Sequence, residues 1–304
     1  MQKGFTIKVW NSKELPADWF KRQQADQKAK EELENSVKAI ISQVKADGDA
    51  ALVEFALKFD KAELSPRELK VKPREIKEAY NKTSPQQISA LKFMQQKVSS
   101  LQKQLLTQTD IKTTSDGVSV QTVLRPIESV GCYVPGGQAT YPSTLVMSVV
   151  PAKVAGVPRI VVCSPSDAKG KVNPLVLVAA DICGVDEVYR VGGAQAIAAF
   201  AYGTKTIAPV RKIVGPGSKY VTAAKVLVST DVAIDMPAGP SEVLVLADES
   251  ADARLIAFDM VSQAEHGGDS VAGVITTSEK VAKNVQENLA KVAASAERGE
   301  KVSE

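Results

Sequence analysis

Hydrophobic side chains recur at helical spacing through most of the first 108 residues. Within residues 35–47, the apolar positions that fall on one helix face are Val37, Ile40, Ile41 and Val44. The same period is found in three further segments, residues 49–59, 73–81 and 86–106. The pattern therefore predicts that the N-terminal part of the chain is mostly helical.

Residues 109–126 follow a different pattern, in which apolar and polar side chains alternate. Val118 and Val120 are each followed by a polar residue, Ser119 and Gln121. A period of two is typical of extended chain with one face turned away from solvent. An extended bridge or an edge hairpin is predicted for this segment.

From about residue 127, short β-branched runs alternate with helical segments. Strands are predicted at residues 129–134, 159–163, 187–191, 212–214 and 232–235. Helices are predicted between them at residues 143–155, 174–183, 194–201 and 219–227. Strands that alternate with helices of this length indicate parallel βαβ units, and hence an open α/β sheet.

After residue 240 the alternation starts again with a second unit. A strand at 242–246 and a helix at 251–265 are followed by a strand at 271–276 and a helix at 280–294. The remaining residues, 298–304, add no apolar element that could close a sheet. We therefore expect the chain to stop before this second unit is complete.

Composition excludes several classes of protein. The 38 basic and 35 acidic residues nearly balance, which argues against a nucleic-acid or membrane-surface partner. The chain shows no apolar leader segment and no apolar run of the roughly 18 residues that a membrane span requires. The three cysteines lack metal-binding or disulfide spacing and are expected to be small buried residues; they are Cys132, Cys163 and Cys183. A cytoplasmic protein is expected.

Glycine-rich turns follow three of the predicted strands. They contain Gly136-Gly137, Gly192-Gly193 and Gly215-Pro216-Gly217. Ligands of open α/β sheets bind at the carboxyl ends of strands, where free amides at a helix start suit a phosphate or a nucleotide edge. None of these turns matches G-x-G-x-x-G, and any tight βα turn needs glycine, so each alone fits a purely structural role equally well. Three such turns at one sheet edge favour a cleft there.

His266 is the one histidine of the chain, and it lies three residues after Gln263 near the predicted end of a helix. Residues three apart share a helix face, so an imidazole nitrogen and an amide oxygen could supply two zinc ligands. From spacing alone the simpler reading is stronger, namely a histidine that closes a helix against its dipole. Ser241, in a rigid Pro/Gly turn, could likewise serve as a hinge residue or face a substrate.

Four segments occur together in one order: residues 131–137 (GCYVPGG), 191–196 (VGGAQA), 236–242 (MPAGPSE) and 262–267 (SQAEHG). In this combination the chain resembles the histidinol dehydrogenase family. The resemblance covers most of the chain and is densest between residues 131 and 270. It implies NAD-dependent oxidation of L-histidinol through histidinal to L-histidine, with zinc holding the imidazole and amino group of the substrate.

The resemblance also implies roles for individual residues. Gln263 and His266 match zinc ligands and substrate contacts, and Ser241 matches a further substrate contact. Tyr133 and Gln195 match NAD contacts. A third NAD contact would be made by Ser218, where the family usually has asparagine, and Gly268 stands where it usually has proline.

Further expectations concern what the chain lacks. The family's catalytic Glu-His pair and its remaining zinc ligands, an Asp and a His, lie further along the sequence, so no catalytic residue is expected here and the zinc site is expected to be incomplete. The chain is expected to be the N-terminal portion of a homodimeric enzyme whose subunits exchange C-terminal segments, and to be inactive by itself.

The predicted fold is α/β, with two Rossmann-like open-sheet domains, the second inserted in the first, and an N-terminal helical part. Residues 1–126 and 240–304 would form one discontinuous domain that carries the partial zinc and substrate site, and residues 127–239 the inserted NAD domain. Two alternatives remain open. One is a related zinc- and NAD-dependent dehydrogenase of another small alcohol, and the other is a non-catalytic nucleotide-binding module.

Overall fold

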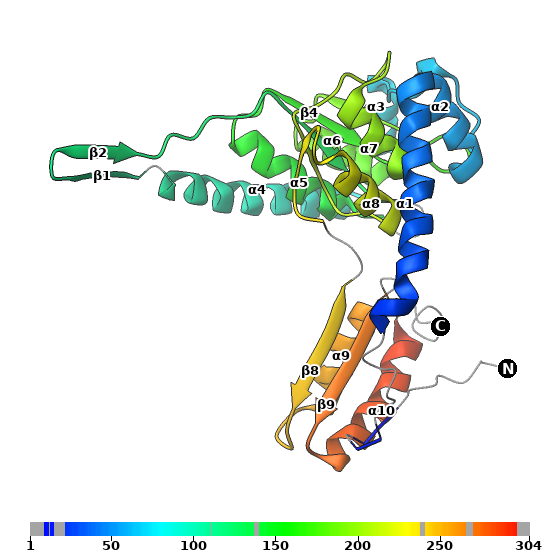
Figure 1. The fold of residues 1–304 in the computed structure, drawn as a ribbon, viewed down its shortest axis with the longest axis vertical. Coiled ribbons are helices and arrows are strands. Elements are labelled where there is room, and N and C mark those ends of the chain that lie inside the picture. Colours follow the sequence, from blue (N-terminus) through cyan, green and yellow to red (C-terminus); the bar gives the residue numbers. More distant parts are fainter. Residues whose placement is uncertain are drawn as a thin grey trace. The chain divides into compact units, whose positions relative to one another are not determined.

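The computed structural model describes residues 9–11, 13–14, 22–109, 111–136, 140–237, 241–265 and 270–296. The chain divides into two compact units (Figure 1). The central unit is Gln27–Gly239, and the flanking unit combines Met1–Asp26 with Pro240–Glu304. Each unit is described by itself.

A parallel sheet of five strands forms the middle of the central unit. Its order is β5 (Glu187–Tyr189), β4 (Arg159–Cys163), β3 (Ser129–Tyr133), β6 (Lys212–Val214) and β7 (Ala233–Ile234). From β3 the chain moves outward to β4 and β5, and it then returns to the other side of β3 to form β6. The direction therefore reverses between β3 and β6, where open α/β sheets form a crevice at their carboxyl ends.

Helices cover both faces of this sheet, because the side chains of a buried strand point alternately to either side. Beside Val130 and Cys132 of β3 lie α5 (Pro142–Val154) and α6 (Pro174–Ile182). The opposite face is covered by α7 (Gly193–Tyr202) and α8 (Lys219–Val228). The α/β class predicted from the sequence is thus confirmed.

N-terminal helices add an outer layer to the central unit. They are α1 (Arg22–Asp47), which belongs to this unit from Gln27 on, α2 (Asp49–Phe55) with a π-helical turn (Ala56–Asp60), a 3-10 turn (Pro66–Glu68), α3 (Pro73–Tyr80) and α4 (Pro85–Gln108). The side chains of α1 and α2 join the core with α7, whereas α3 and α4 pack on α6 and α5. The sequence predicts that residues 1–126 and 240–304 form one discontinuous domain. Because this concerns how the two units are related, it stays a prediction.

Local sequence explains where these helices begin. Ser84 precedes α4, and its hydroxyl oxygen accepts a hydrogen bond from the Gln87 amide at 3.2 Å, while the Gln87 side chain accepts one from the Ser84 amide at 3.0 Å. This reciprocal capping box satisfies two amides that a helix start leaves without partners. The residues that follow the caps of α4 and α6 are both prolines, whose fixed φ suits a first helical position.

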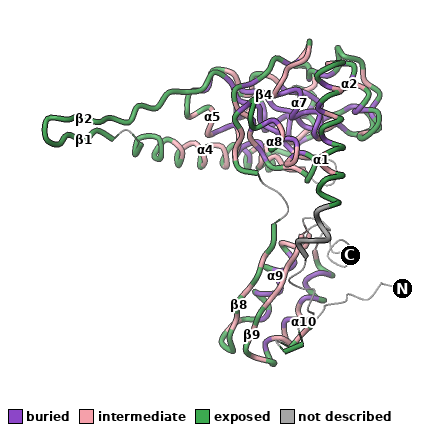
Figure 2. Tube along the Cα trace, in the orientation of Figure 1, coloured by how far each residue is buried: buried purple, intermediate pink, exposed green. Residues whose placement is uncertain are grey.

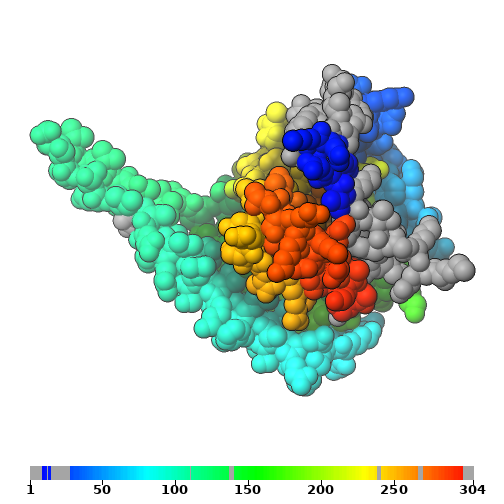
Figure 3. Space-filling model, turned by 90° about the horizontal axis from the view of Figure 1, so that it is seen from below, coloured from blue at the N-terminus to red at the C-terminus, as the bar shows by residue number. Residues whose placement is uncertain are grey.

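A hairpin extends from the central unit beyond α4. Its strands β1 (Lys112–Ser115) and β2 (Val118–Gln121) are antiparallel, and both are exposed along their whole length (Figure 2). The turn residues Asp116 and Gly117 have φ values of 50° and 80°. Positive φ at both central residues matches the twist of hairpin strands. Figure 3 also shows this arm projecting. Of the two predicted alternatives, the structure has a hairpin, which forms a two-stranded sheet of its own and does not extend the edge of the larger sheet.

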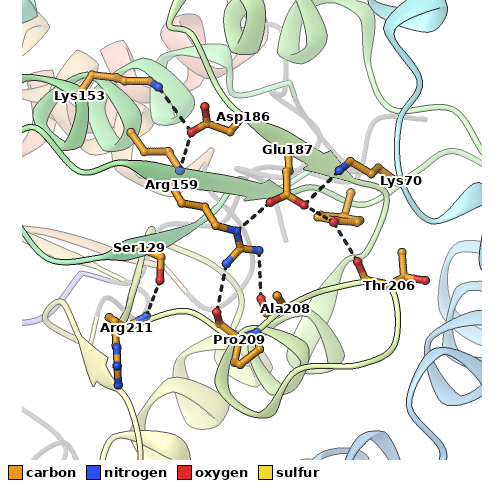
Figure 4. A network of polar contacts seen from close by, with 12 residues as sticks. Lys70, Ser129, Lys153, Arg159, Asp186, Glu187, Thr206, Ala208, Pro209 and Arg211 are labelled. Carbon is orange, nitrogen blue, oxygen red and sulfur yellow. Dashed lines mark hydrogen bonds and ion pairs between the residues drawn. The ribbon is translucent and has the colours of Figure 1, made fainter.

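A network of polar contacts joins the strand starts at the amino-terminal edge of the central sheet (Figure 4). The carboxylate of Glu187 accepts hydrogen bonds from Arg159 Nε at 2.8 Å and Lys70 Nζ at 3.2 Å. Arg159 also donates to the carbonyl oxygens of Ala208 and Pro209, at 3.2 and 3.1 Å. The network ties β4 and β5 to the loop before β6, at the edge opposite the crevice.

The flanking unit is built on two parallel strands, β8 (Glu242–Ala247) and β9 (Val271–Thr276). One face of this small sheet packs against α9 (Ala253–Ala264) and α10 (Glu279–Ser295), which form its core. The other face presents Leu244, Leu246 and Ile275, all exposed within the unit. In both units, no described helix is long and apolar enough to cross a membrane.

Candidate functional site

The crevice between β3 and β6 is bordered by Tyr133, the last residue of β3, and by Gly215, which follows β6. Gly215 has a φ of 117°, and a Cβ atom at this position would collide with the Tyr133 carbonyl group. Glycine is therefore required here, because the two chain segments approach backbone to backbone. This close approach fixes the turn before α8 against the end of β3.

Tyr133 and Gln195 come together at the start of α7. The Gly193 amide donates a hydrogen bond to the Tyr133 hydroxyl at 3.1 Å, and a Cβ on Gly193 would lie 2.6 Å from Gln195 Oε1. Both side chains are buried. Burial raises the pKa of Tyr133 to about 12, so at neutral pH its hydroxyl keeps a proton that it can donate.

Ser218 is exposed and precedes α8 with an extended backbone. Its side chain makes no capping hydrogen bond to α8. Among the described residues, no side-chain hydrogen bond joins Ser218 to Tyr133 or Gln195. The structure thus brings Tyr133 and Gln195 together at Gly193 and places Ser218 on the turn that Gly215 begins.

The side chain of Lys225 anchors the turn that begins at Gly215. Its side chain is fully buried, and Nζ donates to the Gly215 carbonyl at 2.9 Å and to the Met236 carbonyl at 3.4 Å. Nζ also forms an ion pair with Asp235, whose other oxygen accepts from the Gly215 amide at 2.8 Å. The sequence analysis missed this lysine, although a charge beside Val221 on the apolar face of α8 is a readable signal.

Asp60 is a second residue that the sequence analysis missed, and nothing in its surroundings in the sequence marks it. One carboxylate oxygen, Oδ2, is buried and accepts no hydrogen bond from the described residues. This oxygen lies 3.6 Å from where a Cβ on Gly192 would stand. Burial raises the pKa of Asp60 to about 6, because an ionised carboxylate loses its hydration there.

Asp60→Asn is expected to stabilise the protein at neutral pH by about 1 kcal/mol, since the carboxylate is only half-buried and solvent screens its charge. The raised pKa means that the contribution of Asp60 is fully present below 3.8 and is lost as pH rises through about 6. Urea unfolding followed by circular dichroism should therefore show a gain that shrinks as pH falls below 6. Equal gains at all pH values, or the same gain in the exposed Glu63→Gln control, would contradict this.

In the flanking unit, two predicted substrate-site residues touch each other. Gln263, near the end of α9, donates from Nε2 to the Ser241 carbonyl oxygen at 3.0 Å and to Ser270 Oγ at 3.5 Å. Ser241 and Ser270 each precede a strand, so this cluster lies at the amino-terminal ends of β8 and β9. The third predicted residue, His266, and the variant position Gly268 lie outside the described residues.

The amide of Gln263 suits a metal ligand in one respect. Its nitrogen is used by Ser241 and Ser270, and its oxygen accepts no hydrogen bond from any residue that the structure describes. Within those same residues, no group of three His, Cys, Asp or Glu side chains could hold a metal ion. The described residues could therefore contribute one ligand to a zinc site, but they do not by themselves provide a complete set of ligands.

Comparison with known proteins decides the family. The family model of histidinol dehydrogenase matches residues 22–304, which is most of the chain. The chain belongs to the histidinol dehydrogenase family. The resemblance read from the four ordered segments is thereby confirmed.

Histidinol dehydrogenases from several organisms are similar to this chain. That of Archaeoglobus fulgidus is 49% identical over 253 residues, which cover 83% of this chain and 62% of the relative. That of Mesorhizobium japonicum is 47% identical over 270 residues, covering 89% of this chain and 63% of the relative. The chain thus spans about three-fifths of the length of these relatives.

A solved structure supports the fold of this histidinol dehydrogenase family member. The crystal structure of histidinol dehydrogenase from Elizabethkingia anophelis matches with a TM-score of 0.81 and 38% sequence identity. The match covers 89% of this chain and 62% of that chain. The roles of Tyr133, Gln195, Ser218, Ser241 and Gln263 remain predictions, because family membership does not test single residues.

Proposed function

We propose that this chain supplies the NAD-binding part and a portion of the zinc and substrate site of a histidinol dehydrogenase. The activity would be oxidation of L-histidinol through histidinal to L-histidine. The observation that carries the proposal is the meeting of Tyr133, Gly193 and Gln195 at the switch point of an open parallel sheet. Buried polar groups converging at that place are typical of a nucleotide site.

The residues of the central unit have distinct tasks in this proposal. The Tyr133 hydroxyl and the Gln195 amide orient polar groups of the nicotinamide nucleotide, which supplies the hydride acceptor when bound. The first turn of α7 adds backbone amides that have no partner within the helix. Lys225 keeps the Gly215 turn in position, and Ser218, on that turn just before α8, would contact the nucleotide from there.

In the flanking unit, Gln263 and His266 would hold zinc, and Ser241 would contact the substrate. Zinc bound there supplies a positive charge that holds the imidazole and amino groups of histidinol. The hydrogen bond from the Gln263 nitrogen to the Ser241 carbonyl oxygen orients the side-chain amide, and no described residue uses its oxygen. Gln263 thereby positions one neutral oxygen ligand.

The proposal predicts that the 304-residue chain binds NAD without turning over histidinol. Its one histidine, His266, is assigned to zinc in this proposal, so no second histidine is left to form a Glu-His pair for proton transfer. NAD binding is measured by calorimetry, and turnover by NADH absorbance with the Archaeoglobus fulgidus relative as positive control. Gln195→Ala should weaken NAD binding more than Gln96→Ala, an exposed control. Three results would contradict the proposal: absence of NAD binding, an equally small weakening in both variants, or measurable turnover. The alternative, a related dehydrogenase of another small alcohol, is tested by measuring NADH formation from other small alcohols with the relative and with this chain.

Zinc is expected to bind weakly to the same chain, with a dissociation constant well above that of a complete four-ligand site. Two ligands leave at least half of the coordination shell to water. Calorimetry with zinc alone should give a weak isotherm that Gln263→Ala weakens further. Tight binding with one zinc per chain would show that other residues complete the site.

The homodimer and the cytoplasmic location also remain part of this proposal. Sedimentation of the chain at several concentrations tests the dimer. A monomer at all concentrations would show that residues 1–304 lack the contacts that a dimer requires.

A further inference from the structure

The small sheet of the flanking unit places two hydrogen-bond acceptors side by side where its strands begin. β8 and β9 run parallel, and their register pairs Glu242 with Val271 (Figure 1). Ser241 and Ser270 come immediately before these two residues, so they occupy equivalent positions in front of the two strands. Neighbouring strands lie about 4.8 Å apart, a separation that one side chain can bridge.

Gln263 is the side chain that reaches both serines. It lies one residue before the end of α9, and its Nε2 donates to the Ser241 carbonyl oxygen at 3.0 Å and to Ser270 Oγ at 3.5 Å. A primary amide carries two N–H groups on its nitrogen and only lone pairs on its oxygen. The two serines therefore offer one acceptor for each N–H group of Gln263.

The chemistry of these acceptors decides which way the amide faces. A backbone carbonyl oxygen only accepts hydrogen bonds, so the nitrogen of Gln263, and not its oxygen, must face Ser241. Ser241 is exposed, and a single contact there would leave the amide free to turn about it. Ser270 is half-buried and adds a second contact on the nitrogen, which fixes the plane of the amide.

The stability of the unit does not explain why this amide is held twice. The core of the unit consists of apolar side chains from α9, α10 and the sheet, and neither Gln263 nor Ser270 belongs to it. Ordering a long glutamine side chain costs rotamer entropy, which hydrogen bonds between neutral, partly exposed groups barely offset. What the two contacts do achieve is a defined direction for the amide oxygen, Oε1.

We propose that Ser270 is a positioning residue, whose hydroxyl holds the Gln263 amide so that Oε1 is presented to a zinc ion. The inference rests on the proposed function, in which Gln263 is a zinc ligand. Partners that orient the ligands of a metal commonly raise its affinity without touching it. Ser270 acts in this way through Gln263 and does not itself bind the metal.

Calorimetry of the 304-residue chain with zinc alone tests the role of Ser270. Ser270→Ala is expected to weaken zinc binding about fivefold, since the hydrogen bond that it removes is long and joins neutral groups. Ser270→Thr keeps a hydroxyl at this position and should bind zinc as the parent chain does. Ser295→Ala, at an exposed hydroxyl of α10, is the matched control and should also bind like the parent.

A second background separates positioning from direct coordination. Gln263→Glu replaces the amide by a carboxylate, which has no N–H groups to orient and whose two oxygens are equivalent ligands. Ser270→Ala should therefore leave zinc affinity unchanged in the Gln263→Glu chain. An equal loss in both backgrounds would show that Ser270 binds the ion or supports the fold, and it would overturn the positioning role.

Nuclear magnetic resonance gives a readout that needs no metal. The side-chain amide signals of Gln263 are assigned by their loss in Gln263→Glu. Relaxation of these signals should show a restricted amide in the zinc-free parent chain and a more mobile one on the picosecond-to-nanosecond timescale in Ser270→Ala. Equal mobility in the two proteins would also overturn the role of Ser270.

The outcomes distinguish this inference from the proposed function. If Gln263→Ala weakens zinc binding and Ser270→Ala does not, the role of Ser270 is wrong and the proposed function stands. If the parent chain binds zinc no more tightly than Gln263→Ala does, Gln263 is not a zinc ligand, and the inference fails together with that part of the proposed function.

Discussion

Lys225→Met is expected to destabilise the central unit by about 3 kcal/mol, since breaking a buried ion pair leaves its partner uncompensated. The substitution keeps the apolar length of the side chain but removes the donor to the Gly215 and Met236 carbonyls. Asp235 then loses its ion-pair partner. The central unit, Gln27–Gly239, contains neither of the two tryptophans of the sequence, so unfolding should be followed by circular dichroism or hydrogen exchange.

A double-mutant cycle separates the ion pair from general packing. Asp235→Asn alone and combined with Lys225→Met should show a coupling energy of at least about 1 kcal/mol. Lys92→Met, at an exposed lysine of α4, is the control and should change stability little. Additive effects of the two substitutions, or a loss no larger than that of Lys92→Met, would refute the role assigned to Lys225. NAD affinity should also fall in Lys225→Met, because the Gly215 turn loses its support.

Glu187→Gln should cost about 3 kcal/mol at neutral pH, because it weakens the network of Figure 4 at its centre. Burial alone raises the pKa of Glu187, but hydrogen bonds from Tyr189, Arg159 and Lys70 outweigh it and lower the pKa to about 2. The carboxylate therefore accounts for a stability contribution that an uncharged amide retains only in part. Denaturant unfolding of the two proteins measures the difference.

The same pKa shift predicts how the difference depends on pH. A depressed folded-state pKa gives stability that is present above the ordinary value of 4.5 and is lost as pH falls toward about 2. The stability difference between parent and Glu187→Gln should therefore shrink over this range. The control is Glu128→Gln, which breaks the ion pair between Glu128 and Arg211. These two side chains are 76% and 68% exposed, so losing the pair is expected to cost less than about 1 kcal/mol of stability. A difference that persists unchanged to low pH would show that lost packing, and not charge, explains the effect.

Much of the central fold could be predicted because its strands and helices differ in hydrophobic period. Four of the predicted strands begin where β3, β4, β5 and β6 begin, and the hairpin and the helices around the sheet were predicted within a few residues. The expectation that the three cysteines are small buried residues is also confirmed. Strand order could not be predicted, because periodicity tells which face a side chain takes and not which strands are neighbours.

The candidate site could be predicted at the positions where glycines follow the strands. Gly193 and Gly215 have positive φ, and both lie where the sequence placed a ligand edge. Asp60 and the pairing of Arg190 with Glu75 depend on contacts between residues far apart in the chain, which no local pattern encodes. His266 illustrates the opposite case, since its proposed role came from family resemblance and not from spacing.

The position of β3 in the middle of the sheet has a consequence for synthesis on the ribosome. Val130 pairs with Ile160 on one side and with Lys212 on the other, so its second neighbour is made much later than its first. At roughly 5–20 residues per second, one edge of β3 stays open for several seconds. The crevice between β3 and β6, which needs that second neighbour, is thus completed late in translation, and the exposed edge is where a nascent chain is most open to mispairing or to chaperone capture.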